Sequence, residues 1–344
     1  MILVYGAYGY TGQLIVREAV AAGVPLILAG RDRQRTEALA REHGLPCRVF
    51  GLEAPDLSGV RAVLHCAGPF SRTAAPMVDA CLRAGVHYLD ITGEISVFEA
   101  LAARDAEAKH AGILLLPGAG FDVVPSDCLA AHVARRLPTA RSLRLALWTR
   151  GVISHGTATT MVENLGSPGA VRREGRIVPV PAGHDRRTFA FGAERREAAT
   201  IPWGDVSTAF YTTGIPNIAV YTVLPAAVMV GMRWSGLFGP LLRSAPVQRQ
   251  LQRYIDGRPA GPTDAEREAG SCRIVAEAED DAGKVVQSLL SAPEGYTLTA
   301  RTALELARRA AAGDAPIGFQ TPARAYGADF ILGFAGVTRT DLGS

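Results

Sequence analysis

The chain has 344 residues, of which 48% are hydrophobic and 20% charged, and its formal net charge is +3 at pH 7. This length predicts two domains, or one large domain, with a sizeable buried core, and the composition excludes wholesale disorder. The net charge is too small to indicate a nucleic-acid-binding protein. Only two of the 36 basic residues are lysines, Lys109 and Lys284, so arginines and backbone amides would have to bind an anionic ligand.

The five cysteines argue against a metal site or a disulfide framework, because none of them forms a Cys-x-x-Cys pair. This pattern is typical of a reducing compartment. The chain begins Met-Ile-Leu-Val-Tyr-Gly, without the basic and apolar regions of a cleavable leader. We therefore expect a cytoplasmic protein.

The first 118 residues alternate short apolar runs with longer amphipathic ones. Strands are predicted at 2–5, 26–29, 47–50, 62–66, 88–91 and 113–116, and helices at 11–22, 33–43, 75–84 and 97–109. Strands that alternate with helices pair in parallel through right-handed crossovers. The predicted fold class is α/β, with a Rossmann doubly wound parallel sheet followed by a second, mixed α+β domain.

The pattern changes after this point. A helix is predicted at 124–137, a strand at 143–148, a hairpin from 273–279 and 285–290, and a helix at 299–312. We expect a cofactor domain at 1–122 and a substrate-binding and dimerisation domain at 123–314. The tail, 315–344, is a candidate to return to the first domain. The protein is expected to be a homodimer.

The stretch from Ile215 to Met232 contains no charged side chain. A proline near its centre, Pro225, argues against a membrane-spanning helix. The first interpretation is a buried helix or a dimer face. Peripheral membrane contact and the wall of an apolar ligand pocket are the alternatives.

A glycine-rich turn follows the first predicted strand and opens the first helix. Its residues are Gly6, Ala7, Tyr8, Gly9, Tyr10, Thr11 and Gly12. Glycines in this context allow a tight turn and a close approach of the backbone to a pyrophosphate, which the helix N-terminus attracts. We interpret Gly6, Tyr8, Gly9, Tyr10, Thr11 and Gly12 as cofactor-binding residues.

The end of the second strand bears on the choice of cofactor. NAD-dependent enzymes usually place an acidic residue there, whereas this chain has Gly30 and Arg31. The planar guanidinium of Arg31 suits a 2′-phosphate. Asp32, one residue later, is interpreted as the N-cap of the next helix. The predicted cofactor is NADP(H).

Ligands of doubly wound sheets bind at the carboxyl ends of the strands. The glycine-containing loops at later strand ends supply further predicted cofactor contacts: Ala67, Gly68, Pro69, Phe70, Gly93 and Glu94. For substrate contact or proton transfer the candidates are Asp122 and His155. The alternative interpretations are a solvated or structural histidine and a proton donated by water.

These segments together resemble a known family. The segments that carry the resemblance are Gly-Ala-Tyr-Gly-Tyr-Thr-Gly at 6–12, Ala-Gly-Arg at 29–31, His-Cys-Ala-Gly-Pro-Phe at 65–70, Tyr-Leu-Asp-Ile-Thr-Gly-Glu at 88–94 and Pro-Gly-Ala-Gly-Phe-Asp at 117–122. They resemble the saccharopine dehydrogenase (reductase)-like NADP-binding oxidoreductases. Ser-His-Gly-Thr-Ala at 154–158 and Trp-Gly-Asp-Val at 203–206 are similar to the branch that contains trans-acting enoyl reductases.

The resemblance implies a Rossmann domain, a nicotinamide cofactor and a second domain that contacts substrate and often dimerises. It implies reduction of a C=C (enoyl) or C=N (imine) bond of a small or acyl substrate. Two alternatives stay open. One is a catalytically silent NADP-binding module that docks to lipid or a partner, and the other is a saccharopine-type reductase of amino-acid imines.

Overall fold

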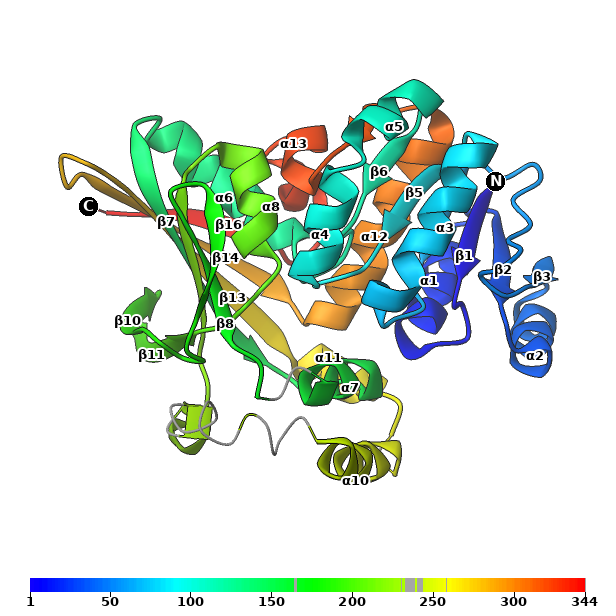
Figure 1. Cartoon of the computed structure of the whole chain (residues 1–344), viewed down its shortest axis with the longest axis horizontal. Coiled ribbons are helices and arrows are strands. Elements are labelled where there is room, and N and C mark those ends of the chain that lie inside the picture. Colours follow the sequence, from blue (N-terminus) through cyan, green and yellow to red (C-terminus); the bar gives the residue numbers. More distant parts are fainter. Residues whose placement is uncertain (164–165, 230, 233–238, 240–243, 258, 344) are drawn as a thin grey trace. The chain divides into compact units, whose positions relative to one another are not determined.

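The computed structural model describes residues 1–163, 166–229, 231–232, 239, 244–257 and 259–343 (Figure 1). Contacts divide the chain into two compact units. Unit 1 comprises Met1–Val124 and Gly295–Phe334, and unit 2 comprises Pro125–Glu294 and Ala335–Ser344. This division differs from the predicted boundaries after residue 294, because residues 295–314 belong to unit 1 and the tail is shared between the two units.

Unit 1 is built on a parallel seven-stranded sheet. Its strands are β1 (Ile2–Tyr5), β2 (Leu26–Gly30), β3 (Cys47–Val49), β4 (Ala62–His65), β5 (His87–Asp90), β6 (Leu114–Leu116) and β15 (Gly318–Phe319). The strand order is β15-β6-β5-β4-β1-β2-β3. This order confirms the predicted doubly wound fold. The interior strand β1, which lies between β4 and β2, is buried along its whole length, as expected where helices cover both faces of a parallel sheet.

The helices of unit 1 follow the predicted pattern with two differences. They are α1 (Tyr10–Ala21), α2 (Arg33–His43), α3 (Phe70–Ala84), α4 (Ile95–Ala102), α5 (Asp105–Ala111), α12 (Gly295–Ala312), α13 (Pro322–Tyr326) and the 3-10 turn η1 (Phe330–Gly333). The single helix predicted at 97–109 is wrong, because the chain forms α4 and then α5. Asp105 begins α5, and its carboxylate accepts the Phe319 N–H at 2.9 Å, which ties the helix to β15.

The second difference is the destination of α12. This helix packs against α1 and against strands β1, β4 and β5, so that it covers part of the cofactor-domain sheet (Figure 1). Its buried positions recur at helical spacing, among them Leu298, Thr302 and Leu306. The predicted helix exists, but it belongs to the first unit rather than to the second.

Unit 2 is a mixed α+β domain, as predicted. Its strands are β7 (Ala140–Arg150), β8 (Gly169–Arg173), β9 (Arg176–Val180), β10 (Arg186–Phe191), β11 (Glu194–Thr200), β12 (Asn217–Thr222), β13 (Ser271–Asp280), β14 (Val285–Pro293) and β16 (Thr338–Leu342). Its described helices are α6 (Val124–Arg136), α7 (His155–Glu163), α8 (Asp205–Thr213), α10 (Ala245–Asp256) and α11 (Asp264–Ala269). The predicted hairpin is confirmed as β13 and β14, which pair antiparallel.

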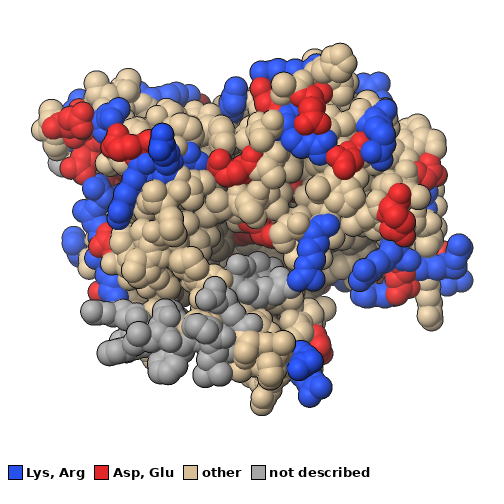
Figure 2. All heavy atoms as spheres, viewed as in Figure 1, with Lys and Arg blue, Asp and Glu red and all other residues tan. Residues whose placement is uncertain are grey.

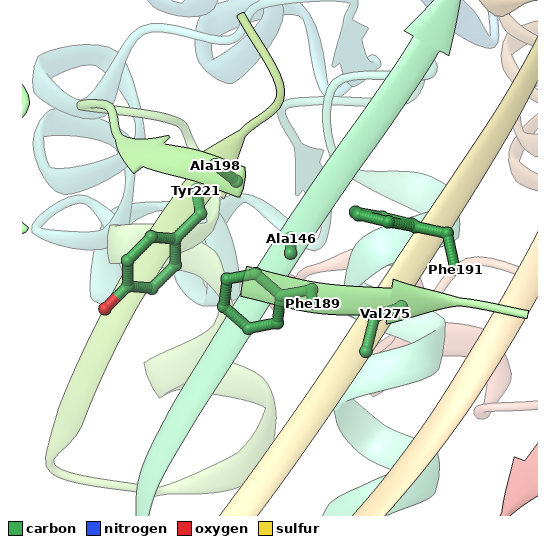
Figure 3. Close-up of a cluster of buried hydrophobic side chains, with 6 residues drawn as sticks. All are labelled: Ala146, Phe189, Phe191, Ala198, Tyr221 and Val275. Atoms are coloured by element: carbon green, nitrogen blue, oxygen red, sulfur yellow. The ribbon is translucent and has the colours of Figure 1, made fainter. Parts of the chain in front are cut away.

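A buried cluster marks one core of unit 2. Phe189 and Phe191 on β10 pack across β7 and β13, onto Ala146 and Val275 (Figure 3). Tyr221 on β12 lies beside Phe189 with ring centroids 5.1 Å apart. The strands of unit 2 form one nine-stranded sheet. Its strand β10 folds back over β7 and β13 of the same sheet, and the buried cluster lies between them.

The charge-free stretch at 215–232 is not a single buried helix, because part of it is a strand and, of its described residues, only those near its end, among them 226–229, are helical. Residues 217–222 are strand β12, which lies parallel to β7 and buries Ile218 and Val220. Pro225 to Val228 are exposed, and residue 230 lies outside the described residues. Among the described residues, no helix is both long and apolar enough to cross a bilayer. The proposed membrane, dimer and pocket roles of this stretch stay predictions.

Charged side chains of both signs are present on the one face of the molecule that Figure 2 draws. On the face drawn in Figure 2, basic and acidic residues are interspersed. Many arginines are paired with acidic neighbours, for example Arg104 with Asp79 at 2.6 Å and Arg144 with Glu279 at 2.6 Å.

Candidate functional site

The glycine-rich turn forms a backbone cradle at the start of α1. Gly6 has a positive φ of 81°, and a Cβ there would lie 2.8 Å from the Cβ of Ala67. A Cβ on Gly12 would lie 2.5 Å from the Gly6 carbonyl oxygen. Both positions therefore require glycine. The N-cap residue of α1 is Gly9, which offers no capping side chain, and the positive end of the helix dipole there fits the pyrophosphate of a dinucleotide.

Tyr8 lies over Gly30, at the end of β2. A Cβ on Gly30 would lie 2.4 Å from Cε1 of the Tyr8 ring, so glycine is what allows the ring to approach. The Arg35 guanidinium stacks on the same ring, with its Cζ 4.5 Å from the ring centroid. Arg31 is exposed directly after Gly30. Asp32 accepts the Arg35 N–H at 3.0 Å, which confirms it as the N-cap of α2.

The loop from β4 to α3 contains the predicted contacts Ala67, Gly68, Pro69 and Phe70. Thr73 holds this loop by donating its hydroxyl hydrogen to the Ala67 carbonyl at 2.7 Å. His65 Nε2 lies 3.0 Å from the same hydroxyl. Burial lowers the pKa of His65 to about 3, so the imidazole is neutral. Because the threonine hydrogen is engaged with Ala67, the neutral ring donates from Nε2.

Asp90, at the end of β5, is fully buried. Its Oδ1 accepts the N–H groups of Thr92 and Gly118, each at 3.0 Å, and its Oδ2 accepts the Tyr88 hydroxyl at 2.8 Å. Burial raises the pKa of Asp90 to about 6, although these three hydrogen bonds favour the carboxylate. Asp90 thus joins the ends of β5 and β6.

Glu94 was expected to contact the cofactor, and the structure gives its carboxylate a different neighbour. Oε1 accepts the Phe70 N–H at 2.7 Å, and Oε2 accepts the Ser71 N–H at 3.0 Å. The carboxylate therefore caps the N-terminus of α3, where a negative charge is favourable. Gly93, one residue earlier, faces Asp122.

Asp122 lies at the loop after β6, close to the end of β5. A Cβ on Gly93 would be 2.7 Å from Asp122 Oδ2, so glycine leaves room for this carboxyl. Burial raises the pKa of Asp122 to about 6. The loop is anchored by α12, because Thr299 Oγ1 accepts the Phe121 N–H at 2.9 Å and Thr302 donates to the Ala119 carbonyl at 2.9 Å.

His155 belongs to unit 2, where it begins α7. Its Nε2 lies 3.0 Å from Asp256 Oδ1 on α10, and the pKa of Asp256 is lowered first by a hydrogen bond from Gln252 and then by this contact. Asp122 and His155 are therefore in different units. Their roles in chemistry stay predictions.

Sequence reasoning missed the residues that hold the loops. Asp90 carries a signal, because an acidic residue that ends an apolar strand is unusual in a buried sheet. Thr73 and Thr299 carry none, because a threonine in a helix is ordinary and Thr299 is 178 residues from its partner Phe121.

The strand order and the glycine cradle define unit 1 as a dinucleotide-binding Rossmann domain. Residues 2–116 match the family described as the saccharopine dehydrogenase NADP binding domain. The chain therefore carries the NADP-binding domain of that family.

Relatives extend the similarity beyond the first domain. A "Putative trans-acting enoyl reductase" of Mycobacterium tuberculosis is 26% identical over 373 residues, covering 91% of this chain and 84% of that protein. A "Trans-acting enoyl reductase" of Mycobacterium ulcerans is 30% identical over 148 residues, covering 39% of this chain and 35% of that protein. Apo saccharopine dehydrogenase (L-Glu forming) from Saccharomyces cerevisiae has a TM-score of 0.65 at 11% identity and covers 99% of both chains, which shows a shared fold.

Proposed function

We propose that this protein is an NADPH-dependent reductase of a C=C (enoyl) or C=N (imine) bond in a small or acyl substrate. The observation that carries the proposal is the position of Asp122, a carboxyl of raised pKa beside the glycine of a strand-end loop in a dinucleotide-binding sheet. Strand ends are where the substrates and cofactors of such sheets bind.

NADPH, when bound, supplies a hydride, and reduction of either bond also requires one proton. Asp122 is placed to hold that proton. A carboxyl whose pKa is near 6 is protonated in a larger fraction of molecules at neutral pH than an ordinary aspartate. The cradle of Gly6, Gly9 and Gly12 would hold the pyrophosphate, and Arg31 the 2′-phosphate.

Similarity to other proteins bears on the choice between a C=C and a C=N substrate. The protein named "Putative trans-acting enoyl reductase" matches this chain at 26% identity over 91% of its length. The saccharopine dehydrogenase structure shares only the fold, at 11% identity. This difference favours the enoyl substrate over the imine.

The test is oxidation of NADPH by the full chain with a panel of enoyl thioesters and a panel of cyclic and amino-acid imines. We expect turnover with at least one enoyl compound. Turnover only with lysine plus a 2-oxo acid would instead assign saccharopine-type chemistry. Tight NADPH binding without turnover on either panel would support the silent module, and no NADPH binding would overturn the proposal.

A further inference from the structure

Three strand-end loops of unit 1 are joined by one chain of hydrogen bonds. It begins at the β6 loop, where the Gly118 N–H donates to Asp90 Oδ1 at 3.0 Å. Asp90 Oδ1 also accepts the Thr92 N–H at 3.0 Å, and Thr92 Oγ1 accepts the Glu94 N–H at 3.0 Å. This chain of hydrogen bonds ends at the β4 loop, where the Glu94 carboxylate accepts two N–H groups of α3.

We propose that Asp90, Thr92 and Glu94 are positioning residues that hold the loops after β4, β5 and β6 in the geometry that receives the nicotinamide half of the cofactor. This inference rests on the proposed function. The three residues act through the backbone of the loops, and Asp90 is too deeply buried to reach a bound ligand itself.

The hydrogen-bond chain ends at the N-terminus of α3, and this position affects where a cofactor phosphate can bind. Glu94 takes up the first two amides of α3, so its negative charge offsets the positive end of that helix. Gly9, the N-cap residue of α1, has no side chain that could cap this helix in the same way. A cofactor phosphate is therefore directed to α1 rather than to α3, and the β4 loop stays ordered before the cofactor arrives.

The position of the hydrogen-bond chain in the sheet predicts which part of the cofactor lies next to the loops that it holds. The loops it joins follow β6, β5 and β4, which lie side by side on one side of β1. Gly30 ends β2 and Arg31 follows it, on the other side of β1. Loss of the hydrogen-bonded chain should therefore weaken binding of the nicotinamide half and leave the 2′-phosphate half unaffected.

The experiment compares two ligands that differ in that half. NADPH and 2′-phospho-ADP-ribose, which lacks the nicotinamide ring, are titrated calorimetrically into the full chain and into Glu94→Ala. We expect Glu94→Ala, which removes both hydrogen bonds to α3, to raise the Kd for NADPH about fivefold to tenfold, because the loss reaches the ligand only through the loop, and to leave the Kd for 2′-phospho-ADP-ribose unchanged.

A second variant tests the middle of the hydrogen-bond chain, at Thr92. Thr92→Val preserves the shape of the side chain but removes the acceptor of the Glu94 N–H. It should reproduce the same selective loss, and Glu94→Gln, which keeps one acceptor oxygen, should restore part of the affinity. Glu107→Gln is the matched control, because it removes an exposed ion pair with Arg104 on the surface.

The outcomes separate this inference from the proposed function. If both ligands lose affinity equally in Glu94→Ala, the role is structural and the inference is overturned. Unchanged NADPH affinity in both Glu94→Ala and Thr92→Val also overturns it. If the unaltered protein binds neither ligand, it is the proposed function that fails.

Discussion

Thr299 on α12 accepts the backbone N–H of Phe121 at 2.9 Å, across 178 residues of sequence. Phe121 precedes Asp122, so a helix from the far end of the chain fixes the loop that carries the proposed proton donor. The same helix packs against α1, which begins at the phosphate cradle. The cofactor domain therefore depends on residues that sequence reasoning assigned to the other domain.

Replacement of Thr299 by valine tests this dependence. The variant leaves the buried Phe121 N–H without its acceptor, which should cost roughly 1–3 kcal/mol in the free energy of unfolding. Urea unfolding gives this value, and hydrogen exchange at the Phe121 amide should accelerate. Thr338→Val, at an exposed position of β16, is the control and should change neither quantity. Equal stability of the two variants would contradict the anchoring role.

Arg31→Ala tests the cofactor preference. Because a charge-assisted hydrogen bond contributes roughly 1.5–3 kcal/mol, the Kd for NADPH should rise by about tenfold or more. The Kd for NADH, which lacks the 2′-phosphate, should stay the same. Calorimetric titration measures both constants. Arg33→Ala is the control, because Arg33 is exposed and paired with Glu37. A parallel loss of both cofactors in Arg31→Ala would argue against a 2′-phosphate contact.

Gly12→Ala tests the phosphate cradle. The added Cβ would meet two backbone oxygens, those of Gly6 at 2.5 Å and Ala7 at 2.7 Å, so the start of α1 must shift. We expect NADPH affinity to fall by at least about tenfold, as seen by fluorescence titration. Gly333→Ala has open space around its new Cβ and should bind NADPH like the unaltered protein. Retained affinity in Gly12→Ala would disprove the cradle.

The pH dependence of turnover tests Asp122. A proton donor must be protonated, and burial raises the pKa of this carboxyl to about 6. The rate constant kcat should therefore be highest below pH 6 and fall about tenfold per pH unit above it. Asp122→Asn should lower kcat by about 10²–10⁴ and abolish that slope, while NADPH still binds. A pH profile that is unchanged in Asp122→Asn would transfer the role to water or another group.

The sequence was sufficient to predict the six principal strands of unit 1, because most of them are short apolar runs between turn signals. It was also sufficient for the cradle and for Asp32, whose contacts are local. It did not predict the partner of Glu94, since Phe70 and Ser71 are more than 20 residues away and any helix N-terminus attracts a carboxylate. The destination of α12 was unpredictable for a related reason. An apolar helical face specifies that it is buried, but not which sheet buries it.

The chain enters unit 2 after Val124, returns to unit 1 at Gly295 and leaves again after Phe334. A ribosome makes the chain from its N-terminus, so the Rossmann sheet is released first without α12 or its seventh strand β15. These elements emerge only after the whole insertion at 125–294 has been synthesised. Unit 2 in turn waits for β16, which is translated after the segment that returns to unit 1. Neither domain can be transplanted as one continuous piece of sequence, and recombination between relatives would have to exchange several segments together.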